Sequence, residues 1–238
     1  TVVARILEII NLIDKNIKFF QPLSSNMFGK AAETPQNEDT ALRPQSPYAA
    51  AKILAYVMCK YYREVHGLHA STAIFYNHES VRRTTEYVTR KITKAAARIK
   101  MGLQKEEKFG NLDTKLDFGY APDYVEAAWN ILQLDYPDDF IICTGEVHSI
   151  QEFLDEAFSI VGLDPKDHII FDEKFKRPGS TGILVGTTDK AKKAFGFEPK
   201  TRFKDIVKIM VEHDLEEAKK ELILMSDSAV TLKTNKSR

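Results

Sequence analysis

The sequence predicts an α/β fold of the doubly wound type, in which helices cover both faces of one parallel sheet. Two observations carry this prediction. Apolar residues recur at helical spacing in long segments, and short runs rich in β-branched and aromatic residues follow these segments. A helix–strand–helix–strand order favours parallel strands joined by helical crossovers. We therefore expect the C-terminal part of such a sheet, together with a smaller α/β domain.

The first four elements are expected within residues 1–76. RILEIINLIDKN repeats isoleucine at helical spacing and predicts an opening helix, and IKFFQPLSS then predicts a strand. After a polar loop, Ser46 and Pro47 predict the start of a long helix that extends to about Gly67, with Ser46 as its N-cap. LHASTAIFY follows and predicts a second buried strand.

Beyond Tyr76 the pattern loosens, and we expect helices at about 87–102, from about 122, and in SIQEFLDEAFSIVGL. DDFIICTG, near 139–144, predicts a third strand, and the remainder to about Leu222 predicts one short strand and two helices. Residues 1–76 and the strand near 139–144 are thus expected in the first domain, and 77–222 mainly in the second. Residues 223–238 lack a periodic pattern, so we expect a disordered tail.

Composition excludes several classes of function. Lys plus Arg and Asp plus Glu both number 34, so the chain lacks the basic excess that nucleic-acid binding requires. No apolar stretch approaches the roughly 18 residues of a membrane span. Cys59 and Cys143 stand in apolar contexts typical of buried thiols in a reducing compartment. We expect a cytoplasmic protein whose partners include neither nucleic acid nor membrane.

The strongest chemical signal is a pair of residues near the start of the long helix. Tyr48 and Lys52 stand four positions apart, which places both side chains on one helix face. A Lys ammonium beside a phenol lowers the phenol pKa and favours proton transfer at an alcohol hydroxyl. Ser24 and Ser25 end the preceding predicted strand, at the edge where open parallel sheets bind their ligands. Ser, Tyr and Lys together therefore predict a site that transfers a proton at a sugar or alcohol hydroxyl.

Four segments of the chain resemble the GDP-mannose 4,6-dehydratases, extended members of the short-chain dehydrogenase/reductase superfamily. These segments are LSSNMFGKAAETPQNEDTALRPQSPYAAAK, FYNHESVRRTTEYVTRKITKAAARIKMGLQ, GNLDTKLDFGYAPDYVEAAWNILQ and ICTGEVHSIQEFLDEAF. The resemblance runs from residue 1 to about residue 220. It implies a Rossmann-type NADP-binding domain, a nucleotide-sugar domain and a lyase reaction. In that reaction a GDP-linked sugar is oxidised at C4, loses water across C5 and C6, and regains the hydride at C6.

The resemblance also implies roles for individual residues. Ser24 matches the catalytic Thr or Ser, Tyr48 the Tyr that transfers the proton, and Lys52 the Lys that also holds the nicotinamide ribose. The implied substrate-binding residues are Asn77, Lys91 and Arg177, with the two cations near the diphosphate.

Arg82 and Arg83 match a loop that reaches the cofactor of a neighbouring subunit in this family. This match implies a homodimer or homotetramer.

Three positions depart from the family pattern. Asn26 stands where the family has the Glu that removes the C5 proton, Leu116 replaces an Arg, and Ser180 replaces a Glu. Because an amide cannot accept that proton, Asn26 favours an alternative enzyme, a GDP-sugar C4 dehydrogenase, reductase or epimerase that does not eliminate water. Leu116 and Ser180 would change contacts to the nucleotide or the sugar.

The glycine-rich turn that binds the cofactor pyrophosphate in this superfamily has no match in the sequence. The first glycine is Gly29, and Gly179, Gly182 and Gly186 have the wrong spacing for that turn. We therefore expect a fragment without the leading strand–helix units, which keeps an inactive or purely binding subunit open as a further alternative. His66 and His69 lack a second ligand pair, so no metal site is expected.

Overall fold

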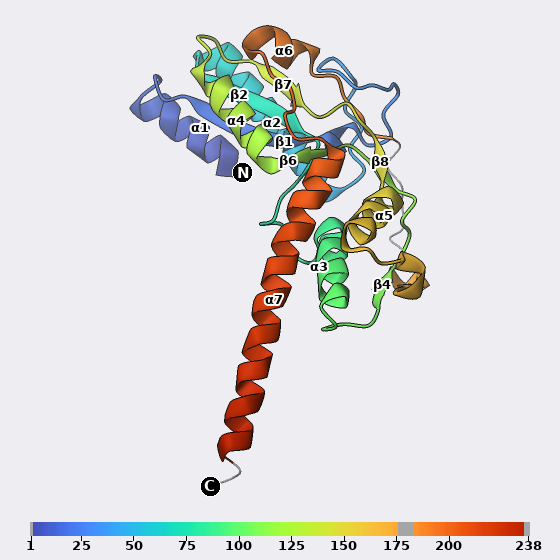
Figure 1. The fold of residues 1–238 in the computed structure, drawn as a ribbon. Helices are drawn as coiled ribbons and strands as arrows, with labels where there is room; N and C mark the ends of the chain where they lie inside the picture. Colours follow the sequence, from blue (N-terminus) through green and yellow to red (C-terminus); the bar gives the residue numbers. More distant parts are fainter. Residues whose placement is uncertain (1, 176–182, 236–238) are drawn as a thin grey trace. The chain divides into compact units, whose positions relative to one another are not determined.

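The structure is a computed structural model that describes residues 2–175 and 183–235. It forms two compact units, each discontinuous in sequence (Figure 1). Unit 1 consists of Thr1–His78, Lys115–His148 and Gly179–Arg202. Unit 2 consists of Glu79–Thr114, Ser149–Pro178 and Phe203–Arg238.

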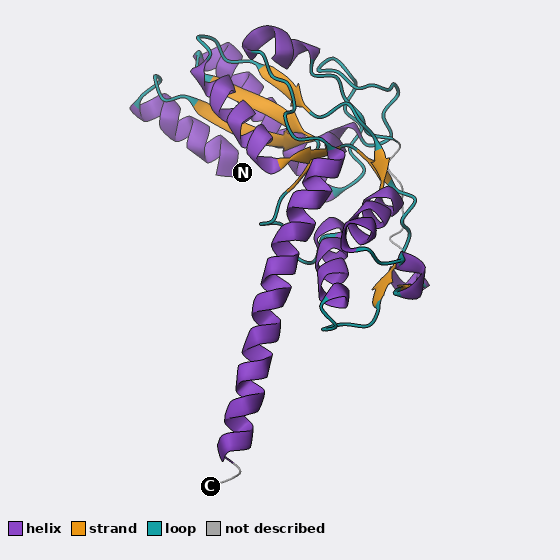
Figure 2. Cartoon of the chain, in the orientation of Figure 1, coloured by secondary structure: helices purple, strands orange, loops and turns teal. Residues whose placement is uncertain are grey.

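Unit 1 is built on a three-stranded parallel sheet in the order β1-β2-β7 (Figure 2). Its strands are β1 (Phe19–Ser24), β2 (Ala70–Phe75) and β7 (Asp139–Ile142). In the register of the sheet, Ser24 stands opposite Phe75, and Phe75 opposite Ile142. The carboxyl ends of all three strands therefore meet at one edge of the sheet, and the predicted parallel α/β fold is confirmed.

The helices of unit 1 are α1 (Val2–Ile13), α2 (Pro47–His66), α4 (Ala121–Gln133) and α6 (Asp189–Phe195). Alternating side chains of the strands divide between two cores, as the strand period of two requires. Ile74 and Ile141 pack with residues of α2, whereas Ala73, Phe140 and Ile142 pack with residues of α4 and α6. The sheet is thus covered on both faces, as Figure 2 shows for α2 and α4.

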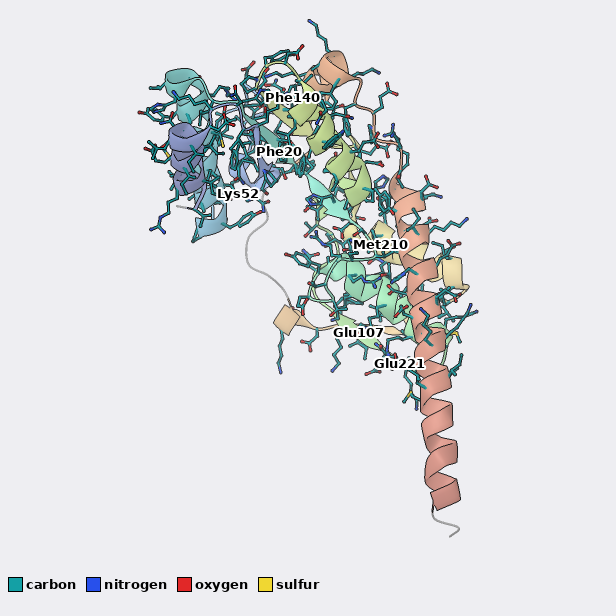
Figure 3. The ribbon with its side chains drawn as sticks, turned by 90° about the vertical axis from the view of Figure 1, so that its left-hand side faces the viewer. Phe20, Lys52, Glu107, Phe140, Met210 and Glu221 are labelled. Carbon is teal, nitrogen blue, oxygen red and sulfur yellow. The ribbon has the colours of Figure 1, made fainter. Side chains whose placement is uncertain are left out.

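Unit 2 is mainly helical. Its long helices are α3 (Val88–Lys100), α5 (Ile150–Val161) and α7 (Phe203–Asn235), which pack against one another. The buried guanidinium of Arg90 lies 2.5 Å from the Asp214 carboxylate, which also accepts the Thr93 hydroxyl at 2.7 Å. These contacts join α3 to α7, and a second ion pair farther along joins Arg98 to Glu221, which is labelled in Figure 3.

Short elements complete the two units. The parallel pair in unit 2 is β4 (Glu107–Phe109) with β9 (Ile169–Phe171). Two further short pairs are β3 (Asn77–Glu79) with β6 (Phe118–Tyr120), and β5 (Lys115–Leu116) with β8 (His148–Ser149). The 3-10 turns are η1 (Ser25–Phe28), η2 (Pro165–Asp167) and η3 (Glu173–Phe175).

The structure corrects the expected domain boundaries. We expected residues 77–222 mainly in the second domain, but 115–148 and 179–202 belong to unit 1. The physical reason is pairing and packing: β7 extends the sheet beside β2, and α4 and α6 cover the face that β7 and β2 present to them. The first domain is therefore assembled from three separate stretches of chain.

The tail is also corrected. Residues 223–238 were expected to be disordered, whereas α7 continues as a helix to Asn235. EEAKKELILM, which precedes and begins this stretch, consists of strong helix formers, so a helix already nucleated by packing on α3 propagates at little cost. The lack of a periodic apolar pattern therefore did not mean a lack of helix.

Within the described residues, no helix is long and apolar enough to cross a membrane. The same residues contain no group of three or more His, Cys, Asp or Glu side chains that could hold a metal ion. Cys59 and Cys143 are both buried free thiols.

Candidate active site

The start of α2 positions the Tyr–Lys pair. The Ser46 hydroxyl caps the helix by accepting the backbone N–H of Ala49 at 3.1 Å, and Pro47 occupies the first turn, where its missing N–H costs nothing. Gly67 ends the helix in the left-handed conformation, with φ of 69°. The helix therefore begins and ends at the residues that the sequence predicted.

Tyr48 and Lys52 lie together on α2, as their spacing predicts. The Lys52 ammonium is 5.8 Å from the centroid of the Tyr48 ring, and the Tyr48 side chain is 54% exposed, so a substrate can reach its hydroxyl. Lys52 is half-buried, and burial lowers the pKa of its ammonium. Burial disfavours the charged form of Lys52, and an electron-rich group placed beside the ammonium stabilises that form.

Lys52 also connects α2 to the sheet. Its Nζ donates a hydrogen bond of 2.8 Å to the backbone carbonyl of Pro22 in β1, two residues before the end of the strand (Figure 3 labels Lys52). An ammonium has three N–H donors, so this bond leaves two for a ligand. The bond brings Lys52 to the same edge of the sheet as Ser24.

Ser24 and Asn26 stand at the carboxyl end of β1. The Ser24 hydroxyl accepts the backbone N–H of Asn26 at 3.3 Å, which caps η1, and α2 packs against this turn. Asn26 is exposed and Ser25 is buried, so Ser25 is not placed to meet a substrate. The turn thus gathers Ser24, Asn26, Tyr48 and Lys52 around the end of one strand.

Asn77 lies at the end of the neighbouring strand. It follows β2 by two positions, begins β3 and is half-buried. The next residue, His78, is held by contact of its Nδ1 with the Tyr76 carbonyl at 2.9 Å, and its ring lies 5.2 Å from that of Tyr124. Because β1 and β2 are adjacent, Asn77 belongs to the same sheet edge as Ser24.

The predicted residues Lys91, Arg82 and Arg83 lie in unit 2 rather than in unit 1. In unit 2, Lys91 contacts the Lys108 carbonyl, lies 3.1 Å from the Glu107 carboxylate, and covers the Phe109 ring at 4.7 Å. Lys91 is therefore held against the β4 strand of its own unit.

Arg82, Arg83 and Arg177 complete the predicted set. Arg83 lies 3.1 Å from the Glu79 carboxylate and 3.8 Å above the Tyr87 ring, whereas the Arg82 side chain is exposed. Arg177, like Ser180, lies outside the described residues. Leu116 is half-buried and forms an isolated bridge with Leu184.

Sequence reasoning missed Asp117, which organises the loop after β7. The fully buried carboxylate accepts the backbone N–H of Thr144 at 3.0 and 3.1 Å, the Thr144 hydroxyl at 2.8 Å and the Gly145 N–H at 2.8 Å. Burial raises the pKa of this carboxyl to about 6, although the hydrogen bonds oppose the shift. The sequence did contain a signal for this residue, because Asp117 stands between apolar residues in KLDFG. A carboxylate buried in such a context needs hydrogen-bond donors.

The pKa of Asp117 predicts how stability depends on pH. The native carboxyl holds its proton to a higher pH than the unfolded chain does, so the free energy of unfolding should fall as pH rises from about 4 to about 6. Relative to Asp117→Asn, which does not titrate, the fall should be on the order of 3 kcal/mol. Denaturant unfolding of both proteins at several pH values measures this difference, and a constant difference between pH 4 and 7 would contradict the assignment.

The chain matches a family model described as GDP-mannose 4,6 dehydratase over residues 1–210. It is 48% identical over 208 residues to GDP-mannose 4,6 dehydratase 1 of Arabidopsis thaliana, covering 87% of this chain and 57% of that protein. It is 40% identical over 218 residues to GDP-mannose 4,6 dehydratase of Homo sapiens, covering 84% and 59%. The chain therefore spans little more than half the length of these curated relatives.

Solved structures share the fold. RMD from Pseudomonas aeruginosa, complexed with NADPH, superimposes with a TM-score of 0.83 at 21% identity, covering 90% of this chain and 72% of that one. UDP-glucose 4-epimerase of Thermotoga maritima, with UDP-glucose, gives a TM-score of 0.76 at 22% identity, covering 88% and 67%. At these identities the likeness concerns the fold, and the α/β architecture with its parallel sheet is common to all.

Proposed function

The chain belongs to the GDP-mannose 4,6-dehydratase family, and from this premise we propose that it carries the catalytic residues of an NADP-dependent dehydratase acting on a GDP-linked sugar. The observation that supports this function is the grouping of Ser24, Tyr48 and Lys52 around the carboxyl end of β1. Open α/β sheets bind their ligands at this edge. The buried free thiols support a cytoplasmic location.

The residues at this edge fit a nicotinamide cofactor. Lys52 has two N–H donors beyond the one given to Pro22, which suits the two neighbouring hydroxyls of a ribose, and the exposed Tyr48 hydroxyl can join them. When bound, NADP would supply the hydride chemistry of the reaction. Tyr48 and Lys52 would thus bind the ribose and also act on the sugar from one face of α2.

In the proposed reaction, Tyr48 accepts the proton of the sugar C4 hydroxyl as that carbon is oxidised. The Lys52 ammonium stabilises the phenolate needed for this transfer, and the Ser24 hydroxyl donates a hydrogen bond to the same sugar oxygen. Asn77, at the neighbouring strand end, contacts the sugar. We assign Lys91 and Arg177 to the diphosphate, and the loop of Arg82 and Arg83 to a neighbouring subunit of a homodimer or homotetramer.

Asn26 favours a second candidate function. Water loss across C5 and C6 requires a base for the C5 proton, and the neutral carboxamide of Asn26 has no useful basicity near pH 7. With Asn26 at the strand end, the C4 half of the reaction remains possible without elimination. The protein would then be a GDP-sugar C4 dehydrogenase, reductase or epimerase.

The mass of the product separates the two candidates. The complete protein is incubated with GDP-mannose and NADP, and the products are analysed by mass spectrometry while NADPH absorbance is followed. Loss of one water without net NADPH formation supports the dehydratase. A 4-keto sugar formed with equimolar NADPH, or a C4 epimer, supports the second candidate. Unchanged GDP-mannose, under conditions where nucleotide binding is measured directly, would contradict both.

A further inference from the structure

A long loop joins the two halves of the candidate active site. It runs from the turn η1, which follows Ser24, to the start of α2, which carries Tyr48. The ends of the loop meet, because the Arg43 N–H donates to the Met27 carbonyl at 2.9 Å. Gly29 lies so close to Arg43 that a Cβ at Gly29 would overlap the Arg43 carbonyl oxygen. The loop is thus closed at its base, and its conformation depends on what holds its middle.

The side chain of Gln36 holds the middle of this loop. It is fully buried, and both ends of its amide group have partners. Its Nε2 donates to the Glu33 carbonyl at 2.7 Å and to the Thr34 hydroxyl at 3.2 Å. Its Oε1 accepts the Tyr76 hydroxyl at 2.9 Å. Because an unpaired buried amide is costly, these bonds fix both the loop and the Tyr76 side chain.

The backbone of Gln36 binds a third part of unit 1. Its N–H donates to the Val185 carbonyl at 2.8 Å, and its carbonyl accepts the Thr187 N–H at 2.9 Å. Between these two residues, Gly186 lies directly against Tyr76, since a Cβ at Gly186 would stand 2.9 Å from the ring. The Tyr76 ring is therefore enclosed by two segments that Gln36 ties together, and all of these residues belong to unit 1.

Tyr76 stands directly before Asn77. Its backbone N–H donates to the Ile142 carbonyl at 3.1 Å, and its carbonyl contacts Nδ1 of His78 at 2.9 Å. Burial raises the pKa of the Tyr76 hydroxyl, which therefore stays protonated and keeps donating to Gln36. The residue before Asn77 is thus held by the sheet through its main chain and by the loop through its side chain.

We propose that Gln36 is a positioning residue of the active site, which acts through the Tyr76 hydroxyl to place Asn77 against the sugar. The proposal rests on the function proposed above, in which Asn77 contacts the sugar of a GDP-linked substrate. A contact made equally in the bound substrate and in the transition state lowers KM with little effect on kcat. Loss of the bond between Gln36 and Tyr76 should therefore weaken sugar binding and leave the chemical step nearly unchanged.

Two variants of the complete protein remove this bond from either side. Tyr76→Phe and Gln36→Leu should each raise KM for GDP-mannose about tenfold and change kcat less than about threefold. Calorimetric titration should show the same loss of affinity for GDP-mannose, whereas the affinity for GDP, which has no sugar, should stay within about twofold. The double variant should lose no more than either single variant, because both changes delete one interaction.

Tyr62→Phe is the matched control. Tyr62 is also a buried tyrosine of unit 1, and its hydroxyl donates to the Glu8 carboxylate at 2.6 Å between α1 and α2. This variant should lose thermal stability but keep the ratio of the two affinities. If Tyr76→Phe, folded by circular dichroism, also kept that ratio, the role of the bond would be structural only and the proposal overturned. Tyr76→Phe keeps its ring, so it decides the test if Gln36→Leu fails to fold.

Asn77→Ala separates this failure from a failure of the proposed function. If Asn77→Ala loses affinity for GDP-mannose while Tyr76→Phe does not, only the positioning role of Gln36 is wrong. If Asn77→Ala binds GDP-mannose as tightly as the unsubstituted protein, the sugar contact assigned to Asn77 is wrong, and the positioning role falls with it. An unsubstituted protein that binds GDP-mannose no more tightly than GDP would have the same consequence.

Discussion

Replacing Tyr48 with Phe is expected to lower turnover at least about 10²-fold, because the phenol that accepts the sugar proton is removed. The ring itself is retained, and the side chain is exposed, so the fold and the nucleotide affinity should change little. Steady-state kinetics with the GDP-linked sugar, together with calorimetric titration of the nucleotide, measure the two effects separately. The loss should fall on kcat rather than on binding.

Tyr136→Phe provides the matched control for this substitution. Tyr136 is also an exposed tyrosine of unit 1, but it lies between α4 and β7 rather than beside Lys52, so its hydroxyl should not affect turnover. If the Tyr48→Phe protein kept more than about a tenth of the original rate, a proton-transfer role would be excluded, since general acid–base catalysis contributes at least about 10²-fold.

Replacing Asn26 with Glu is expected to raise the rate of water loss from the oxidised sugar by about 10²- to 10⁴-fold, which is the usual contribution of a general base. Asn26 is exposed, and both of its described bonds in the turn are made by its backbone: the N–H donates to Ser24, and the carbonyl accepts the Gly29 N–H at 3.2 Å. A longer side chain should therefore not disturb η1. Mass spectrometry of the product, which detects the loss of one water, measures the change.

Asn26→Gln is the control for size. Gln has the length of Glu without its basicity, so this variant should eliminate water no faster than the unsubstituted protein. Equal rates of elimination in the unsubstituted protein and the Glu variant would show that another group supplies the base. The dehydratase would then be favoured over the C4 oxidoreductase.

The sequence alone determined the local elements. Ser46 with Pro47 marked the start of α2 and Gly67 its end, because capping depends on residues within one turn of the helix terminus. The helix of SIQEFLDEAF is likewise fixed at its start by a capping box between Ser149 and Glu152. The spacing of Tyr48 and Lys52 was enough to place them on one face, since that geometry is a property of the helix itself.

Contacts between distant residues could be decided only by the tertiary structure. β7 joins β2 although the whole of unit 2's first stretch and all of α4 separate them in sequence, and no local pattern encodes that pairing. The bond from Lys52 to the Pro22 carbonyl and the cluster of donors around Asp117 are of the same kind. Each depends on how the strands are ordered.

The apolar residues of α1 and α2 show the difference most directly. Periodicity in the sequence identified both segments as helices, because it reports which side chains share a face. It did not report what covers that face, so Ile10 and Ile13 were equivalent in the pattern, yet in the fold Ile10 is buried and Ile13 is 75% exposed. Burial is set by the elements that pack on a helix from elsewhere in the chain, and for this reason only the folded structure separates core from exposed surface.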